Sequence, residues 1–164
     1  MIRIIEVQSN EYNLIQHIVY TTWPIAYGEI LSKEQLDYML GKFYTIKALN
    51  KNVEDGHRFL FAKEGDDTLG FIGYENNYNG LAATKIHKIY ILPDTQGKGI
   101  GKLLIDRVTE IAKEDQSVKL SLNVNRYNTA QAFYRKLGFE IVLSEDIAIG
   151  NGYLMEDYVM EKAI

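Results

Sequence analysis

The 164-residue sequence predicts one domain of the α/β (α+β) class, with a mixed, mostly antiparallel central sheet of six to seven strands flanked by about four helices. Three observations support this fold class. Segments with the two-residue period of strands alternate with segments that have the 3.6-residue period of helices. One strand–helix–strand unit contains a glycine-rich turn. The apolar fraction of 46% is enough for one core, and no repeat, low-complexity tract or linker divides residues 1–164.

The N-terminal part of the chain predicts a strand and two helices. Apolar residues that roughly alternate over residues 2–7 indicate the opening strand. A helix is expected over Glu11–Trp23, and Pro24 is expected to end it. Ser32 is the predicted N-cap of a second helix, with another turn or two as far as Leu49.

Three strand-like runs follow, and the clusters of turn residues between them predict an antiparallel meander. These runs are His57–Lys63, Leu69–Tyr78 and Ala82–Leu92. After the glycine-rich turn, Lys102–Lys113 has the pattern of an amphipathic helix and Val118–Val124 alternates as a strand. The sequence therefore predicts a βαβ unit in the middle of the chain.

The C-terminal part predicts one short helix and two strands. The helix covers Ala130–Leu137 and stops at Gly138, which can adopt the left-handed conformation beyond a helix end. The strands are Phe139–Leu143 and Tyr153–Met160, with a turn-rich stretch between them.

The composition excludes several kinds of protein. Without Cys, the chain has no disulfides, no thiolate metal ligands and no cysteine nucleophile. No apolar run is long enough for a membrane span, and the N-terminus lacks the pattern of a secretory signal, so we expect a cytoplasmic protein without a membrane partner. A net charge of −4 with scattered Lys and Arg argues against nucleic acid as a partner and suits a cationic small substrate.

The most informative stretch is the glycine-rich turn Gln96–Gly101, which lies between a predicted strand and a predicted helix. Three glycines in five positions leave the peptide N–H groups at the start of the helix free to face one bound anion, such as a phosphate. The spacing does not fit the dinucleotide fingerprint, and Leu103 follows Gly101-Lys102 where a nucleoside-triphosphate loop needs Ser or Thr. A tight turn that only packs helix against strand is the structural alternative.

The turn instead fits the pattern Q-x-x-G-x-G, in which it resembles the GCN5-related N-acetyltransferase (GNAT) superfamily. Leu92–Asp94 leads into the turn as in many members, and Asn128–Phe139 is similar to the family's second signature. The resemblance covers about residues 82–143 and implies an acyl-CoA N-acyltransferase fold, with acetyl-CoA as co-substrate. The N-terminal stretch also weakly resembles bacterial polyamine (spermidine/spermine) acetyltransferases.

The resemblance implies that a strand edge pairs with the pantetheine arm of coenzyme A and that the glycine-rich turn faces its phosphates. The implied cofactor-binding residues are Ile89, Tyr90, Ile91, Gln96, Gly97, Lys98, Gly99, Ile100, Gly101, Lys102 and Asn128. The family's Asn usually lies seven residues before the Tyr of the second signature, whereas Asn128 lies six before Tyr134, so Asn125 is an alternative. Either Asn can instead cap a helix.

Two residues are candidates for proton transfer. By the resemblance, His87 stands where relatives often have Glu, and a neutral imidazole can accept the proton of the amine, directly or through water. Tyr134 matches the family's general acid, which protonates the departing thiolate. His17 and His57 show no metal-ligand spacing and are expected to be structural, and no metal is expected.

The acceptor site is expected where the first two helices meet the later strands. Its candidate residues are the aromatic and acidic side chains of Trp23, Tyr27, Tyr74, Glu75 and Glu156, together with Tyr153 and Asp157. Aromatic rings and carboxylates suit a cationic amine. The predicted function is transfer of an acetyl group from acetyl-CoA to a small primary amine, with a polyamine as one option. The alternatives are acetylation of proteins or peptides and a regulatory module that binds acyl-CoA without turnover, and a homodimer is left open.

Overall fold

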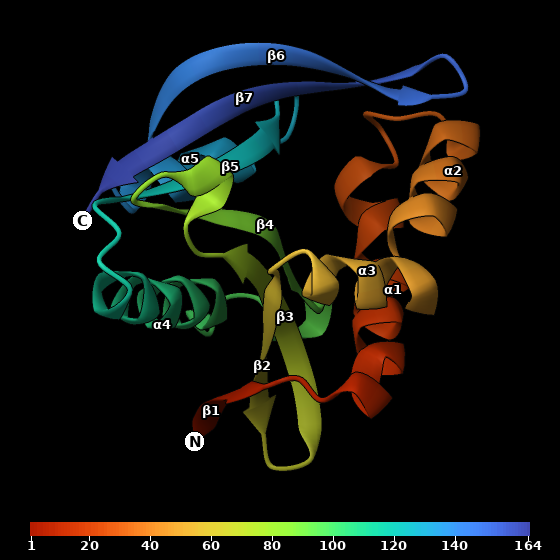
Figure 1. Ribbon diagram of the computed structural model, residues 1–164. Coiled ribbons are helices and arrows are strands. Elements are labelled where there is room, and N and C mark those ends of the chain that lie inside the picture. The colour runs from red at the N-terminus through yellow and green to blue at the C-terminus, as the bar shows by residue number, and fades with distance from the viewer.

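The computed structural model covers residues 1–164 and contains one seven-stranded sheet (Figure 1). The strands are β1 (Ile2–Glu6), β2 (Arg58–Glu64), β3 (Asp67–Glu75), β4 (Ala83–Ile91), β5 (Lys119–Asn125), β6 (Glu140–Gly150) and β7 (Tyr153–Ala163). Their order across the sheet is β1-β2-β3-β4-β5-β7-β6. The pair β4–β5 is parallel and every other pair is antiparallel, which confirms the predicted mixed, mostly antiparallel sheet.

Five α-helices and three short 3-10 turns connect the strands. The helices are α1 (Tyr12–Tyr27), α2 (Lys33–Phe43), α3 (Ile46–Glu54), α4 (Ile100–Glu114) and α5 (Ala130–Lys136). The 3-10 turns are η1 (Ser9–Glu11), η2 (Tyr78–Gly80) and η3 (Pro93–Thr95). In Figure 1, α1, α2 and α3 form one group and α4 lies apart from them, across the strands. None of the helices has both the length and the apolar character that a membrane crossing requires.

The sheet separates two hydrophobic cores. One core packs α4 against residues such as Leu60, Ile72 and Leu120, and the other packs α1, α2 and α3 against residues such as Phe61 and Phe71. The alternation of side chains along β2 and β3 explains the division, because successive residues of a strand face opposite sides of the sheet. Each face is thus covered by its own helices.

The first helices differ from the prediction in two ways. Pro24 lies inside α1 instead of ending it, and the helix continues to Tyr27. Proline removes one helical hydrogen bond, and α1 has only three residues left beyond Pro24, so burial of Trp23 in the core outweighs that loss. The predicted extra turns beyond α2 form a separate helix, α3, because the Thr45 side chain accepts a hydrogen bond from the N–H of Ala48 and caps it.

The last two strands are longer than predicted. The turn-rich stretch is a tight connection at Asn151, and β6 continues up to it, so each strand has 11 residues. The tip of this β6–β7 hairpin rests on α2, where the Tyr38 hydroxyl donates to the carbonyl of Ile149 at 2.8 Å. The Gln35 side chain donates to the carbonyl of Leu154 at 2.8 Å. The hairpin therefore covers the space between the sheet and α2 (Figure 1).

A β-bulge in β4 lies where the sheet opens between β4 and β5. Gly73 pairs with Lys88 and Tyr74 pairs with Ile86, so His87 is an extra residue in a β-bulge. The parallel pairing of β4 with β5 ends at Ile86, immediately before the bulge. Because a bulge bends its strand, the two strands separate beyond this point and leave a gap that side chains and a ligand can enter.

Candidate active site

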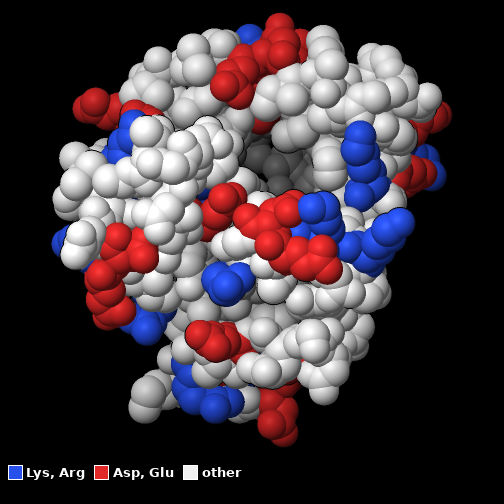
Figure 2. All heavy atoms as spheres, in the orientation of Figure 1, with Lys and Arg blue, Asp and Glu red and all other residues white.

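A cavity of about 980 Å³ begins where β4 and β5 separate. Its walls come from α1, α2, β4, the start of α4, β5, α5 and β7, and most of its lining residues are hydrophobic. Figure 2 shows a hollow in the molecule under the β6–β7 hairpin, with both acidic and basic side chains below it. The size and the mixed lining are typical of a small-molecule site.

One end of the cavity is the glycine-rich turn. Gly97 and Gly99 have φ angles of +91° and +73°, which favour glycine, and a Cβ atom at either position would meet no other atom within 4 Å. Gly99 is the N-cap of α4, so the unpaired N–H groups of the first helical turn face this open space. The arrangement suits an anion such as a diphosphate.

The charged side chains of the turn point elsewhere. The Lys98 ammonium lies 3.6 Å from a Glu64 carboxylate oxygen, and the Lys102 ammonium lies 2.6 Å from an Asp106 oxygen. Neither lysine lines the cavity, whereas the other residues from 96 to 101 do. The backbone, and not the two lysines, therefore supplies most of the polar surface at this end.

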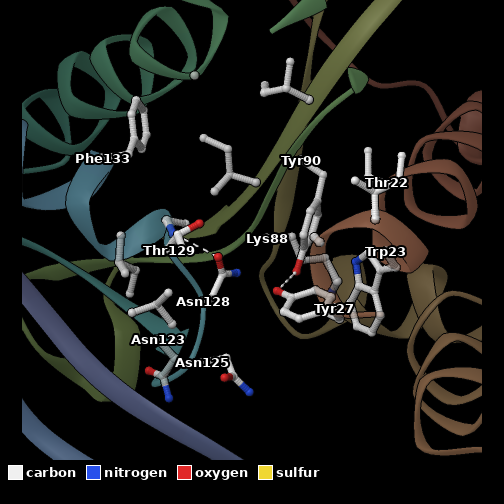
Figure 3. Close-up of a pocket in the computed structure, with 18 of the residues that line it drawn as sticks. Thr22, Trp23, Tyr27, Lys88, Tyr90, Asn123, Asn125, Asn128, Thr129 and Phe133 are labelled. Atoms are coloured by element: carbon white, nitrogen blue, oxygen red, sulfur yellow. Dashed lines mark hydrogen bonds between the residues drawn. The ribbon is translucent and has the colours of Figure 1, made fainter. Parts of the chain in front are cut away.

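Asn125 and Asn128 both line the cavity, and the choice between them stays open. The Asn125 side chain accepts the N–H of Tyr127 at 2.9 Å, and the Asn128 side chain accepts the N–H of Ala130 at 2.9 Å. Both side-chain oxygens thus stabilise the loop before α5. In Figure 3, Asn128 lies across the cavity from the hydroxyl of Tyr27.

A group of aromatic residues forms the opposite wall. The Tyr27 hydroxyl, at the end of α1, lies 3.1 Å from the Tyr90 hydroxyl on β4 (Figure 3). The Trp23 ring packs against Tyr27, Tyr44 and Tyr90 with ring centroids 5.0 to 5.8 Å apart. Burial raises the pKa values of Tyr27, Tyr44 and Tyr90, so all three hydroxyls stay protonated at neutral pH.

Tyr134 comes from α5 and lines the middle of the cavity. Its ring is held edge-on against Phe133 and Phe139, with centroids 5.3 and 6.0 Å apart. Burial raises the pKa of Tyr134, and the residue is only 8% exposed. A protonated hydroxyl in a fixed position can donate a hydrogen bond or a proton, as expected for a general acid.

His87 is part of a cluster that the sequence did not reveal. Its Nε2 lies 2.9 Å from Oε1 of Glu75, and Nε2 of His57 lies 3.4 Å from the same oxygen. The two imidazole rings are stacked, with centroids 4.0 Å apart and planes 4° from parallel. The Tyr78 ring packs edge-on against His87. The bulge in β4 thus brings the predicted base next to a carboxylate and a second histidine.

This geometry determines how His87 can handle protons. A carboxylate oxygen only accepts hydrogen bonds, so Nε2 of neutral His87 carries the hydrogen and Nδ1 remains as the proton acceptor. Burial, and then the charges of Lys88 and Lys85, lower the pKa of His87 to about 3, so the ring is neutral at working pH. The ligand atoms of His57, Glu75 and His87 lie within 4.8 Å of one another, a spacing that a metal ion can also use.

The candidate acceptor residues divide into two groups. Trp23 and Tyr27 line the cavity as expected, whereas Tyr74, Glu75 and Glu156 do not. Tyr74 belongs to the core under α4, because it faces the other side of the sheet. Glu75 binds the two histidines. Glu156 is one residue away from Asp157, and only Asp157 faces the cavity.

The sequence matches one protein family and is similar to two N-acetyltransferases. Residues 29–162 match the family described as Acetyltransferase (GNAT) domain. An uncharacterized N-acetyltransferase of Methanocaldococcus jannaschii is 33% identical over 100 residues, which are 57% of this chain and 43% of that protein. A spermidine N(1)-acetyltransferase of Thermoplasma acidophilum is 28% identical over 141 residues, 82% of this chain and 83% of that protein.

Among solved structures, the PaiA N-acetyltransferase of Thermoplasma acidophilum in complex with coenzyme A superposes with a TM-score of 0.83. The two sequences are 23% identical, and the superposition covers 100% of this chain and 99% of the other. The fold is therefore shared over the whole length of the chain.

Proposed function

This chain belongs to the GNAT acetyltransferase family, and on this premise we propose that it transfers an acetyl group from acetyl-CoA directly to the primary amine of a small molecule. One observation carries the proposal. A single cavity joins the glycine-rich turn, the split edge of β4, Tyr134 and His87. An anion site, a strand edge, an acid and a base thus share one enclosed space, as a direct transfer between two bound substrates requires.

Acetyl-CoA fits the proposed donor end. The backbone of Gln96, Gly97 and Gly99 surrounds the open space at the start of α4, where a diphosphate can accept hydrogen bonds from the main chain. The edge of β4 from Ile89 to Ile91 has lost its partner β5 and can pair with the amide groups of a pantetheine arm. The complex of the Thermoplasma PaiA neighbour with coenzyme A supports this assignment.

The chemical step needs a base, because an amine with a pKa of about 10.4 is almost entirely protonated at pH 7. The ammonium first loses one proton to solvent. As the nitrogen attacks the thioester carbon it becomes strongly acidic, and Nδ1 of His87 then accepts its second proton, while the Glu75 carboxylate holds the ring and balances the imidazolium charge. The new nitrogen–carbon bond forms as the carbon–sulfur bond breaks. Tyr134 then donates its hydroxyl proton to the departing thiolate and regains a proton from solvent.

The cover over one side of the cavity supports a small acceptor. The β6–β7 hairpin rests on α2 through the bonds of Tyr38 and Gln35 and roofs the site. An extended peptide would need an open groove at this place. The Thermoplasma spermidine acetyltransferase supports polyamines as one class of acceptor to test.

The test is acetyl-CoA consumption, followed by thiol release, with a panel of amines. The wild type is expected to show amine-dependent release, and Tyr134→Phe is expected to lower kcat by about 100-fold or more, the range for a lost general acid. Tyr20→Phe is the matched control, because Tyr20 is exposed on α1 and does not line the cavity. No amine-dependent release with any amine would reject the proposed function, and an unchanged kcat in Tyr134→Phe would reject the role of Tyr134.

A further inference from the structure

Lys88 is a partly buried cation without an ion-pair partner in the chain. It is the only Lys or Arg that lines the cavity. Its ammonium donates to the side-chain oxygen of Asn52 at 3.0 Å and lies over the rings of Tyr44 and Phe59, 5.4 and 5.9 Å from their centroids. Burial lowers the pKa of Lys88 to about 8, so it is mostly charged at pH 7. A buried ammonium without a counter-charge is costly, and an anion brought by a ligand would relieve that cost.

No carboxylate forms an ion pair with Lys88. The nearby Glu75 carboxylate accepts from the neutral His87 and lies beside His57 instead, and the charges that act most on His87 are those of Lys88 and Lys85. The positive field of Lys88 reaches both imidazoles and contributes to their lowered pKa values. This part of the cavity therefore has a positive potential that favours an anionic group.

A carboxylate faces the same aromatic group from the other side. Asp157 is the only acidic residue that lines the cavity, and Asn123 donates to it at 3.2 Å. The charge of Asp157 is close enough to Tyr27 to contribute to the raised pKa of that hydroxyl. Tyr27 contacts Tyr90 (Figure 3). The Tyr44 ring, which lies under the Lys88 ammonium, packs on Trp23, as Tyr27 and Tyr90 do. One negative and one positive group thus flank one tyrosine cluster.

Apart from Thr22 and Gln35, the remaining wall on the acceptor side is apolar. It is formed by side chains from α1 to α2 and from β7, namely Leu31, Met39, Phe43, Leu154 and Met155. These residues offer no hydrogen bonds and suit a hydrocarbon or thioether group. The acceptor end therefore combines one anion, one cation and an apolar surface.

We propose that the acceptor is a small zwitterion, such as an α-amino acid with an apolar side chain, whose carboxylate pairs with Lys88 and whose ammonium faces Asp157 before it loses its proton. This inference rests on the proposed acetyl transfer. The product is the N-acetylated acid: the amine nitrogen gains the acetyl carbon, the thioester bond breaks, and the carboxylate stays unchanged. A polyamine fits less well, because it would place additional cations near Lys88 with only one carboxylate to bind them.

The experiment compares acceptors that share a carbon skeleton and differ in the carboxylate. The pairs are leucine with 3-methylbutylamine, methionine with 3-(methylthio)propylamine and phenylalanine with phenethylamine, and spermidine is added as the polyamine. At pH 7 and saturating acetyl-CoA, we expect kcat/KM to be about tenfold or more higher for the acid of at least one pair, the size of a charged hydrogen bond.

Three variants assign that preference. Lys88→Met is expected to reduce the preference to about twofold or less, and Lys88→Arg is expected to restore most of it. Lys63→Met is the matched control, because Lys63 also lies on a strand over an aromatic ring but is paired with Glu11 and does not line the cavity. It is expected to keep the wild-type preference.

The outcomes separate this inference from the proposed function. If the wild type acetylates each acid and its decarboxylated partner equally, or prefers spermidine to every acid, the inference is wrong and the acetyl transfer stands. If no amine is acetylated while acetyl-CoA still binds, the proposed function is wrong. The wild-type comparison alone decides the first point, so it does not depend on the folding of Lys88→Met.

Discussion

At the scale of single residues, Lys88 shows how a buried charge can conflict with stability. Lowering its pKa from 10.5 to about 8 corresponds to about 3 kcal/mol that the folded protein loses while the lysine is charged. Lys88→Met would also lose the hydrogen bond to Asn52 and the contacts with two rings, which offset part of this cost. We therefore expect Lys88→Met to stabilise the protein by about 1 kcal/mol at pH 7.

The sign of this effect can be checked with pH. A lysine with a lowered pKa destabilises the folded state below that pKa, and the effect disappears as pH rises from about 8 to about 10.5. The gain in Lys88→Met, measured by urea unfolding, should thus be present at pH 7 and absent near pH 10.5. Lys63→Met, which removes an ion-paired lysine, should show no such gain. A lower stability of Lys88→Met at pH 7 would mean that the chain itself compensates the charge.

Glu75 is a positioning residue in the proposed mechanism, because it acts on the amine only through His87. In Glu75→Gln a neutral amide replaces the carboxylate and stabilises the imidazolium less. We expect kcat to fall by about 10- to 100-fold with unchanged affinity for acetyl-CoA. The exposed Glu114→Gln on α4 is the control. A kcat of Glu75→Gln within twofold of wild type would exclude this role.

The residues of the site differ in how well the sequence predicts them. Tyr134 and His87 both line the cavity. The sequence indicates them because each lies in or next to a short motif with a recognisable turn or strand. The contact between Glu75 and His57 depends on the exact register of β2 and β3, and a bulge after Ala62 shifts that register. A shift by one residue moves a side chain to the other face of a sheet, and Tyr74, a candidate for the acceptor site, lies on the face that packs against α4.

At the scale of elements, the glycine-rich turn and α4 form one anion-binding unit. Gly99→Glu would place a carboxylate at the N-terminus of α4, in the open space proposed for the diphosphate. We expect calorimetry to show no binding of coenzyme A, while the far-UV circular dichroism spectrum stays the same.

Gly65→Glu is a control that isolates the backbone effect. Gly65 also has a positive φ, +60°, and also has open space around its Cβ position, but it lies in the turn between β2 and β3. It should carry a similar backbone strain and still bind coenzyme A. Unchanged affinity in Gly99→Glu would show that the phosphates bind elsewhere.

Element boundaries were predicted well where the local sequence decides them. The periods of α4 and β5 and the glycine turn between them are local signals, and they agree with the structure. The end of α1 and the length of β6 and β7 depend on distant contacts instead. Burial of Trp23 stabilises the end of α1 by more than Pro24 destabilises it. The hydrogen bond from Tyr38 on α2 stabilises the tip of the β6–β7 hairpin. Such contacts are visible only in the folded chain.

At the scale of the whole molecule, the histidine cluster connects the neighbouring strands β2, β3 and β4 and should make the fold sensitive to acid. The pKa values of His57 and His87 are lowered to about 4 and about 3, mainly by burial, whereas an unfolded histidine has a pKa of about 6.5. Between these values the unfolded chain binds more protons than the folded chain. The stability that depends on these neutral rings is therefore fully present above pH 6.5 and is lost as pH falls toward 4.

Urea unfolding at pH 7.0, 6.0, 5.0 and 4.5 tests this linkage. The free energy of unfolding should fall more steeply below pH 6.5 in the wild type than in His57→Asn, which lacks one of the two buried imidazoles. Carboxyl groups titrate in the same pH range. The effect of the histidines is therefore measured as the difference between wild type and His57→Asn in the slope of unfolding free energy against pH. His17→Asn is the matched control, because His17 is exposed on α1, and it should follow the wild type. If the curves of unfolding free energy against pH are parallel for His57→Asn and wild type, protonation of the stacked rings does not destabilise the sheet. The cluster would then be less buried than its contacts with Glu75 indicate.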